Sequence, residues 1–313
     1  MTEIHVQSPG LFTTVQDLGR EGFGPIGVSP SGAADPTSLR IGNRLVGNPD
    51  GAAALEMTLL GGTFLFPQGA IIALAGSDFG ATLDDSAIPP HQTIEIHPGQ
   101  TLRLGPTRSG ARCYLCVHGG ISVELFLGSA STHVLSGLGG FDGRPLRKGD
   151  VLVVGPAPQP FHTRALASHA TDLLAQRKTF RITPGPQVEK FSEPSRQLFY
   201  ESTFSIAEES DRLGLRLTGP AIHANSHREM ITEGVSLGAI QITPEGQPII
   251  LFVDQQTTGG YPKIANVITA DLPSLGQLRP RDQVRFEPVN WDAARQLLIE
   301  QKRLLNSADL IIG

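Results

Sequence analysis

EMTLLGGTFLFPQGAIIALAGS (residues 56–77) aligns without a gap with EGVSLGAIQITPEGQPIILFVD (residues 233–254). Pro67 falls on Pro244, and Gly69 falls on Gly246. In both copies a Pro-x-Gly turn signal separates two apolar, β-branched runs, a pattern typical of two strands joined by a tight turn. The chain is therefore predicted to contain two related β-domains.

The composition fits a mostly β fold with few helices. The chain has 313 residues, enough for two domains with cores of their own, and its 36 Gly and 24 Pro suit short strands and tight turns. We predict a first domain over residues 1–165 and a second over 179–313. The stretch 107–155 has no counterpart in the second copy and is expected to elaborate the first domain.

Three segments have helical signals. DPTSLRIGNRLVGN (35–48) has Asp35 as N-cap, and Gly47 marks its end. HTRALASHATDLLAQRKT (162–179) has helical spacing and is expected to link the domains. In NWDAARQLLIEQKRLLN (290–306) the apolar residues fall on one face, which we expect to dock on a barrel. Its members are Trp291, Ala294, Leu298 and Leu305.

Charge and hydropathy exclude several classes of protein. The net charge is −5, and no basic stripe offers an electrostatic footprint for nucleic acid. No apolar run approaches the roughly 18 residues of a membrane span, and the N-terminal residues lack the apolar core of a signal peptide. A cytoplasmic protein is expected.

Cysteine and histidine patterns do not predict a metal or redox site. Cys113 and Cys116 have C-x-x-C spacing, but they lie in an expected strand, where side chains three positions apart point to opposite faces. Both are expected to be buried thiols. His223 and His227 lack the intervening Glu of a helical zinc motif.

The two copies differ after the second strand. Asp254 occupies the position of Ser77, and QQTTGGYPK (255–263) then replaces the plainer DFGATLDD (78–85). A loop that gains polar side chains on a duplicated scaffold indicates that function was added there, because rigid scaffolds commonly carry their sites on loops. The alternative is a simple turn at Gly259 and Gly260, packed by Tyr261.

Several long motifs resemble those of the biotin-dependent carboxyltransferase-related family. They include TTVQDLGREGFGPIGVSPSGAAD (13–35), LGSAST (127–132), SDRLGLRLTG (210–219) and GAIQITPEGQPIILFVDQQTTGGYPK (238–263). The family includes the C-type subunit of 5-oxoprolinase, also known as allophanate hydrolase subunit 2 or kinase-inhibitor antagonist, and a carboxyltransferase subdomain of urea carboxylase. The resemblance implies a pair of cyclophilin-like β-barrels.

The resemblance also implies a function and partners. We expect the C-type subunit of an ATP-dependent 5-oxoprolinase, which hydrolyses 5-oxoproline to glutamate with a sister B-type subunit (carboxyltransferase-like or kinase-inhibitor-like) and a lactam-utilisation subunit. One alternative is a carboxyltransferase that uses carboxybiotin to act on urea or a similar small amide. The other is a non-catalytic regulator that binds a histidine-kinase inhibitor. The sequence has neither a P-loop nor a biotin-attachment tripeptide, so ATP is expected to bind elsewhere on the chain or at the partner interface, and biotin to come from another chain.

Motif positions supply the candidate site residues. Asp254, Lys263 and Glu233 are the expected catalytic side chains, with Asp254 accepting a hydrogen bond from a lactam or urea N–H. The expected substrate-binding residues are Gln16, Asp17, Arg20, Asp35, Asn43, Ser129, Ser131, Thr132, Gln241, Thr257, Thr258, Gly259, Gly260 and Tyr261.

Each of these assignments has a structural alternative. Lys263 can be a solvated surface ammonium, and Gln16, Asp17 and Arg20 can merely stabilise a turn. Glu56 matches Glu233 in the repeat, which favours a structural role for Glu56. The family usually has Arg at the position of Ala130 and Arg where this chain has Gln255 or Gln256. These loops therefore lack two positively charged side chains that could bind an anion.

Overall fold

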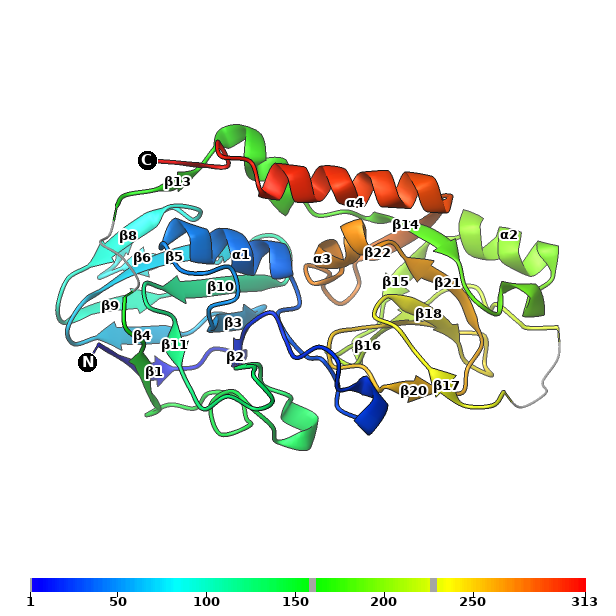
Figure 1. The fold of residues 1–313 in the computed structure, drawn as a ribbon, viewed down its shortest axis with the longest axis horizontal. Helices are drawn as coiled ribbons and strands as arrows, with labels where there is room; N and C mark the ends of the chain where they lie inside the picture. Colours follow the sequence, from blue (N-terminus) through cyan, green and yellow to red (C-terminus); the bar gives the residue numbers. More distant parts are fainter. Residues whose placement is uncertain (1, 158–161, 226–229) are drawn as a thin grey trace. The chain divides into compact units, whose positions relative to one another are not determined.

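The computed structural model describes residues 2–157, 162–225 and 230–313, and the described chain divides into two compact units (Figure 1). Unit 1 comprises Met1–Arg20, Ser31–Ala175 and Leu304–Gly313, and unit 2 comprises Glu21–Pro30 and Gln176–Arg303. The predicted linear domains, 1–165 and 179–313, remain a prediction. In the structure, an early segment belongs to unit 2 and the C-terminus belongs to unit 1.

Unit 1 is built from antiparallel strands. They are β1 (Glu3–Ser8), β2 (Phe12–Gln16), β3 (Ala54–Thr58), β4 (Thr63–Phe66), β5 (Ala70–Gly76), β6 (Thr82–Leu83), β7 (Ser86–Ala87), β8 (Thr93–Ile96), β9 (Gln100–Arg103), β10 (Arg112–Val117), β11 (Ile121–Ser122), β12 (Val151–Val154), β13 (Ala165–Leu166) and β23 (Ile311–Ile312). One sheet has the order β11-β12-β1-β4-β9-β6-β7, a second has the order β2-β3-β10-β5-β8, and β13 pairs with β23.

Both larger sheets of unit 1 contribute side chains to one apolar core. Phe64 and Phe66 of β4 and Leu115 of β10 are fully buried in it. A second cluster lies under helix α1 (Pro36–Leu45), where Leu39 and Tyr114 are buried. Unit 1 also contains the 3-10 helices η2 (Val134–Ser136) and η3 (Ser168–Leu174).

Unit 2 contains a closed barrel, β14-β21-β18-β19-β16-β15-β22. Its strands are β14 (Thr179–Pro184), β15 (Phe204–Ile206), β16 (Gly214–Thr218), β18 (Ala239–Ile242), β19 (Pro248–Leu251), β21 (Lys263–Val267) and β22 (Gln283–Pro288). A separate pair joins β17 (Glu233–Gly234) to β20 (Thr258–Gly259). The helices are α2 (Glu193–Glu201), α3 (Leu272–Leu275), most of α4 (Trp291–Leu305) and the 3-10 helices η1 (Gly24–Ile26), η4 (Val188–Lys190) and η5 (Thr269–Asp271). The mostly β architecture with few helices is confirmed.

The predicted Pro-x-Gly turns are present in both units. The Gly69 N–H donates to the Phe66 carbonyl at 3.1 Å, and the Gly246 N–H donates to the Thr243 carbonyl at 2.9 Å. Both glycines have positive φ angles, of 75° and 83°, which side chains disfavour. In unit 1 the turn carries the chain from one sheet to the other, whereas in unit 2 it joins two strands that pair directly.

The cysteine prediction agrees with the structure. Cys113 lies in the core between the sheets, and Cys116 lies in the cluster under α1, so the two side chains are on opposite faces of β10. Burial raises the pKa of both thiols well above the usual range. Both therefore remain protonated structural thiols at neutral pH.

The helix predictions have mixed outcomes. Asp35 caps α1 by accepting a hydrogen bond from the Ser38 N–H at 3.0 Å, and the C-terminal helix α4 spans Trp291–Leu305. Trp291, expected to be docked, is 67% exposed. The helix expected over 162–179 is wrong, because Ala165–Leu166 pairs as a strand with Ile311–Ile312 and only a 3-10 helix follows.

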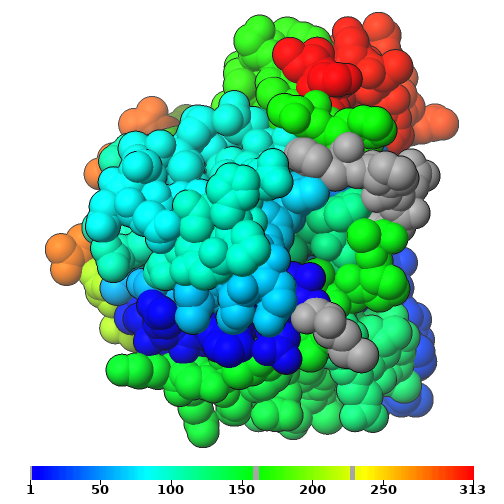
Figure 2. Space-filling model, turned by 90° about the vertical axis from the view of Figure 1, so that its left-hand side faces the viewer, coloured from blue at the N-terminus to red at the C-terminus, as the bar shows by residue number. Residues whose placement is uncertain are grey.

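Figure 2 views unit 1 from the side. The cyan residues of the β6–β9 region form much of this face, and the green segment that follows β10 lies below the blue N-terminal strands. Among the described residues, no helix is long and apolar enough to cross a membrane.

Candidate functional site

Asp254 follows β19 at the start of the polar loop and is buried against Arg212. The Arg212 guanidinium donates from Nε to Asp254 Oδ2 at 2.7 Å and from Nη2 to Oδ1 at 3.2 Å. The Asp254 N–H also donates to the Arg212 carbonyl at 2.8 Å. Both carboxylate oxygens already accept from a buried cation, a geometry that fixes the start of the loop. Its predicted contact with a substrate N–H remains a prediction.

Lys263 begins β21, and its side chain is only 3% exposed. Its ammonium lies 2.5 Å from Oε1 of Glu233, whose own side chain is 43% exposed. The strand pair places this carboxylate, because Glu233 of β17 is opposite Gly259 of β20. A buried ammonium thus meets a carboxylate at the edge of the solvent, and Lys263 is not a freely solvated surface lysine.

Gln187 completes the polar contacts around this ion pair. Its Nε2 donates to Glu233 Oε1 at 2.6 Å, and its Oε1 accepts from the Lys263 N–H at 3.2 Å. Hydrogen bonds from Lys263 and then from Gln187 lower the pKa of the Glu233 carboxyl, against a smaller opposing effect of desolvation. Glu233 is therefore ionised at neutral pH.

Gln241 brings a buried amide to the same loop. Its Nε2 lies 3.5 Å from the Tyr261 carbonyl oxygen, and a Cβ added at Gly259 would come within 2.5 Å of that nitrogen. A side chain at position 259 would therefore displace the Gln241 amide from its present place beside the loop. We call Gln187, Glu233, Gln241, Tyr261 and Lys263 the Lys263 cluster.

The exposed part of the loop surrounds this cluster. Thr258, Gly260 and Tyr261 are exposed, Thr257 is half-buried, and Gly259 is buried. The segment 21–30 of unit 2 also contacts the strand end that leads into the loop, since the Ser29 hydroxyl lies 3.4 Å from the Val253 carbonyl oxygen. Sequence spacing gives no signal for this contact.

In unit 1, Asp17 joins two loops. Its Oδ1 accepts from the Gly19 N–H and the Ser129 hydroxyl, both at 2.7 Å, and from the Ser131 hydroxyl at 2.5 Å. Its Oδ2 accepts from the Ala130 N–H at 2.7 Å. These contacts occupy the carboxylate and both serine hydroxyls, and they support the structural alternative for this motif.

Arg20 and Gln16 are buried beside that junction. Arg20 Nη2 hydrogen-bonds the Ser131 carbonyl, and its guanidinium carbon lies 5.4 Å from the centre of the Phe126 ring. Gln16 Nε2 donates to the Thr132 carbonyl at 3.2 Å, while its Oε1 is buried and accepts no hydrogen bond from any described residue.

The remaining unit 1 candidates have structural contacts. The Asp35 carboxylate caps α1, and Asn43 Nδ2 donates to the Ala52 carbonyl at 2.8 Å. The Thr132 hydroxyl donates to the Val15 carbonyl at 2.8 Å. Their predicted contact with substrate remains a prediction.

The repeated glutamates have opposite environments. Glu56 is fully buried, and its Oε2 accepts from the Tyr114 hydroxyl at 2.7 Å and from the Ala34 N–H at 2.8 Å. Glu233 lies at the exposed edge of the Lys263 cluster. The same repeat position therefore supports the core in unit 1 and the polar loop in unit 2.

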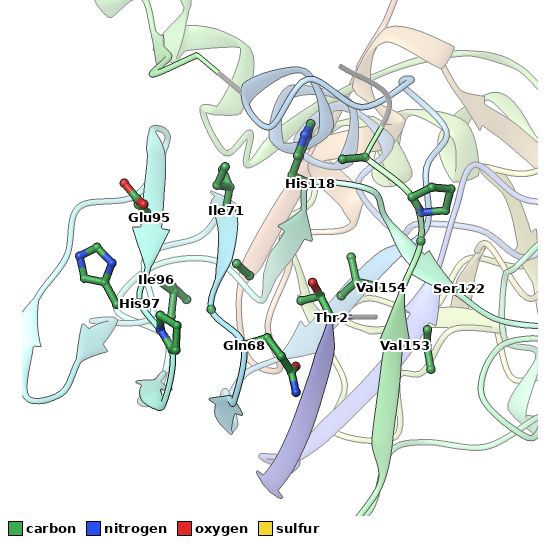
Figure 3. A pocket seen from close by; sticks show the side chains of 16 residues that line it. Thr2, Gln68, Ile71, Glu95, Ile96, His97, His118, Ser122, Val153 and Val154 are labelled. Atoms are coloured by element: carbon green, nitrogen blue, oxygen red, sulfur yellow. The ribbon is translucent and has the colours of Figure 1, made fainter. Parts of the chain in front are cut away.

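A cavity of about 780 Å³ lies elsewhere in unit 1, at one end of its sheets (Figure 3). Of its labelled polar side chains only Glu95 and Ser122 belong to strands, β8 and β11, and Glu95 and His97 lie apart from His118. None of the candidate site residues lines it. Among residues 2–157, 162–225 and 230–313 there is also no group of three or more His, Cys, Asp or Glu that is able to hold a metal ion, and His227 lies outside those ranges.

Comparison with known proteins identifies the family. The model for the carboxyltransferase domain, subdomain A and B, matches residues 26–288. The chain belongs to this carboxyltransferase family. It is 37% identical to the C-type subunit of 5-oxoprolinase from Escherichia coli strain K12, and the match covers 94% of each protein.

The chain is also similar to parts of larger proteins. The chain is 34% identical to urea amidolyase of Saccharomyces cerevisiae over 98% of its own length but only 18% of that protein. The crystal structure of the K. lactis urea amidolyase superposes with a TM-score of 0.91 at 33% identity, over 99% of this chain and 21% of that one. The chain therefore spans about a fifth of each of these amidolyases.

Proposed function

We propose that the chain is the C-type subunit of an ATP-dependent 5-oxoprolinase in the cytoplasm. The observation that carries this proposal is the reciprocal coverage of the E. coli C-type protein, 94% of both chains, compared with 18% of the yeast urea amidolyase. In this proposal the chain works with the sister B-type subunit and a lactam-utilisation subunit, and the complex opens 5-oxoproline to glutamate.

The Lys263 cluster suits a small cyclic amide. A lactam presents a carbonyl acceptor and an N–H donor. The Lys263 ammonium is suited to stabilise charge that develops on the carbonyl oxygen, and the Glu233 carboxylate is suited to accept the N–H. Fixed charges in a partly desolvated site stabilise such a change of charge better than water does. The 2.5 Å ion pair orients both groups in advance.

The cluster does not suit the triphosphate of ATP. Its one ammonium is paired with Glu233, so the pair offers no net positive charge to a polyanion. ATP would activate the lactam carbonyl by phosphorylation, which makes an unstrained amide a better electrophile. We therefore assign lactam binding to this chain, and ATP binding to a surface completed by a partner subunit.

A second candidate is a carboxyltransferase that uses carboxybiotin to act on urea or a similar small amide. The carboxyltransferase family model and the TM-score of 0.91 to the K. lactis urea amidolyase favour it. Urea also presents a carbonyl and N–H groups to the Lys263 cluster, so the cluster alone does not choose between the two substrates. The cluster also offers no contact specific to the biotin ring system, and we route no step through biotin.

Reconstitution distinguishes the candidates. The purified chain is combined with the sister and lactam-utilisation subunits, and glutamate and ADP are measured with and without 5-oxoproline. We expect 5-oxoproline to stimulate ATP hydrolysis, with glutamate formed in equal amount. Biotin-dependent carboxylation of urea without 5-oxoproline turnover would replace the first proposal with the second. A stable complex that turns over neither substrate would favour a regulator.

A further inference from the structure

A cavity of about 470 Å³ in unit 1 lies apart from the candidate site residues. Two stretches line it, 122–126, which begins with the last residue of β11, and 137–143, directly after η2. Both fall within 107–155, the segment that has no counterpart in the second repeat. Figure 1 shows the loops that follow β11 on one side of unit 1. The cavity is therefore formed by a part of the chain that the duplicated fold does not require.

One wall of the cavity has backbone donors without acceptors. The N–H groups of Gly139, Gly140, Phe141 and Asp142 donate no hydrogen bond to any described residue. At the end of this run the Gly143 N–H does donate, to the Gly139 carbonyl at 2.8 Å. Gly140 of this run is buried, where a backbone N–H nearly always has an acceptor, and the other three residues are half-buried or exposed. The run is therefore open to carbonyl oxygens supplied from outside.

The rest of the lining is apolar and partly open. Leu125 is 60% exposed, and Val123, Phe126, Leu138 and Phe141 are half-buried around it. Contiguous apolar side chains exposed next to polar groups commonly mark protein–protein contact sites. An occupant that contributes an apolar side chain would cover Leu125.

Charge selects among possible occupants. Glu124 and Asp142 line the cavity and are exposed, and none of its lining residues is Lys or Arg. The neighbouring Arg144 pairs with Asp150 at 2.8 Å and with Asp142 at 3.4 Å, so Glu124 is the lining carboxylate that no described cation pairs with. A small anion is therefore disfavoured, whereas a peptide segment offers carbonyl acceptors, an apolar side chain and a Lys or Arg for Glu124.

We propose that this cavity docks an extended segment of the sister subunit, with one apolar and one basic side chain. The inference rests on the proposed function, in which this chain works only within a complex. Main-chain hydrogen bonds to an extended segment supply affinity, and the side chains it seats supply specificity.

The test measures binding of the purified sister subunit to full-length variants by calorimetry. Leu125→Asp is expected to raise the dissociation constant at least about 10-fold, as is typical for the loss of an anchor residue. Glu124→Lys is expected to raise the dissociation constant and to make it depend less on salt concentration. Leu11→Asp is the matched control, because Leu11 is 64% exposed and does not line the cavity. Thermal unfolding of each variant establishes that it is folded.

The outcomes separate this inference from the proposed function. Wild-type affinity in Leu125→Asp, with an intact active complex, would overturn the docking site and leave the proposed function standing. An unchanged dissociation constant with a raised KM for 5-oxoproline would also overturn it and would indicate a small-molecule site. No binding of the sister subunit to the wild-type chain would overturn both proposals.

Discussion

Asp254 and Lys263 lie at the two ends of one loop, and each is buried with a partner of opposite charge. The partner of Asp254, Arg212, is buried as well, whereas Glu233, the partner of Lys263, is partly exposed. This difference in burial separates their roles. A buried pair mainly fixes structure, and an ion pair at the edge of the solvent remains accessible to a ligand.

Removing the Asp254 carboxylate is expected to destabilise unit 2. Asp254→Ala leaves the buried Arg212 without its carboxylate, so we expect the free energy of unfolding to fall by about 3–5 kcal/mol. Urea denaturation measures this change. Replacing both partners, Arg212→Met with Asp254→Leu, is expected to recover at least half of the loss. A loss below about 1 kcal/mol in Asp254→Ala would show that the pair has no structural role.

The sequence predicted Lys263, Glu233 and Gln241 as candidates, and the structure places all three in one cluster. It did not predict Gln187 or Arg212, because their contacts depend on which strands become neighbours in the barrel. Gln187 lies after β14, which pairs with β21, the strand that Lys263 begins. The repeat did indicate that Glu56 is structural. Both copies have a Glu at this position, whereas only the second copy has the polar loop, so the loop does not account for the Glu in the first copy.

At the scale of elements, local sequence signals specified caps and turns well. The Asp35 cap and both Pro-x-Gly turns form as predicted because they depend on contacts within a few residues. The 162–179 segment differs, because its pairing partner is at the C-terminus, far along the sequence. A helical spacing pattern does not contain that information.

Two glycines in turns allow the energetic cost of backbone strain to be measured separately from the cost of steric overlap. Gly69 and Gly99 both have positive φ angles, of 75° and 86°, and both donate to the Phe66 carbonyl. A Cβ at Gly69 would lie 2.5 Å from the Ile96 carbonyl oxygen, whereas a Cβ at Gly99 has no neighbour within 4 Å. The two positions therefore differ mainly in the space available to a side chain.

We expect Gly99→Ala to lower the free energy of unfolding by about 1–2 kcal/mol, the cost of a left-handed conformation. Gly69→Ala is expected to lower it by a further ~1–3 kcal/mol, because the surrounding backbone must move. Denaturant unfolding of both variants measures the difference. Equal losses would mean that the turn in unit 1 relaxes without cost and does not fix the passage between the two sheets.

At the scale of the whole molecule, the internal repeat accounts for the presence of two mostly β units in one chain. The repeat predicted both units, but not that unit 2 closes into a barrel by a parallel pairing of β14 with β22. Nor did it predict that residues 21–30 belong to unit 2. Both features arise from tertiary packing, which a gapless alignment of two strands does not encode.

The central claim is that the Lys263 cluster binds the amide substrate, and kcat of the assembled complex tests it most directly. Lys263→Met removes the ammonium and leaves Glu233 at an exposed edge, where an unpaired carboxylate is solvated, so assembly is expected to be normal. We predict a fall in kcat of about 10²–10³-fold, as for the loss of one electrostatic contact to a developing oxyanion. Lys302→Met, at an exposed position of α4, is the control and is expected to retain wild-type kcat. A Lys263→Met complex that assembles and turns over at the wild-type rate would contradict the account.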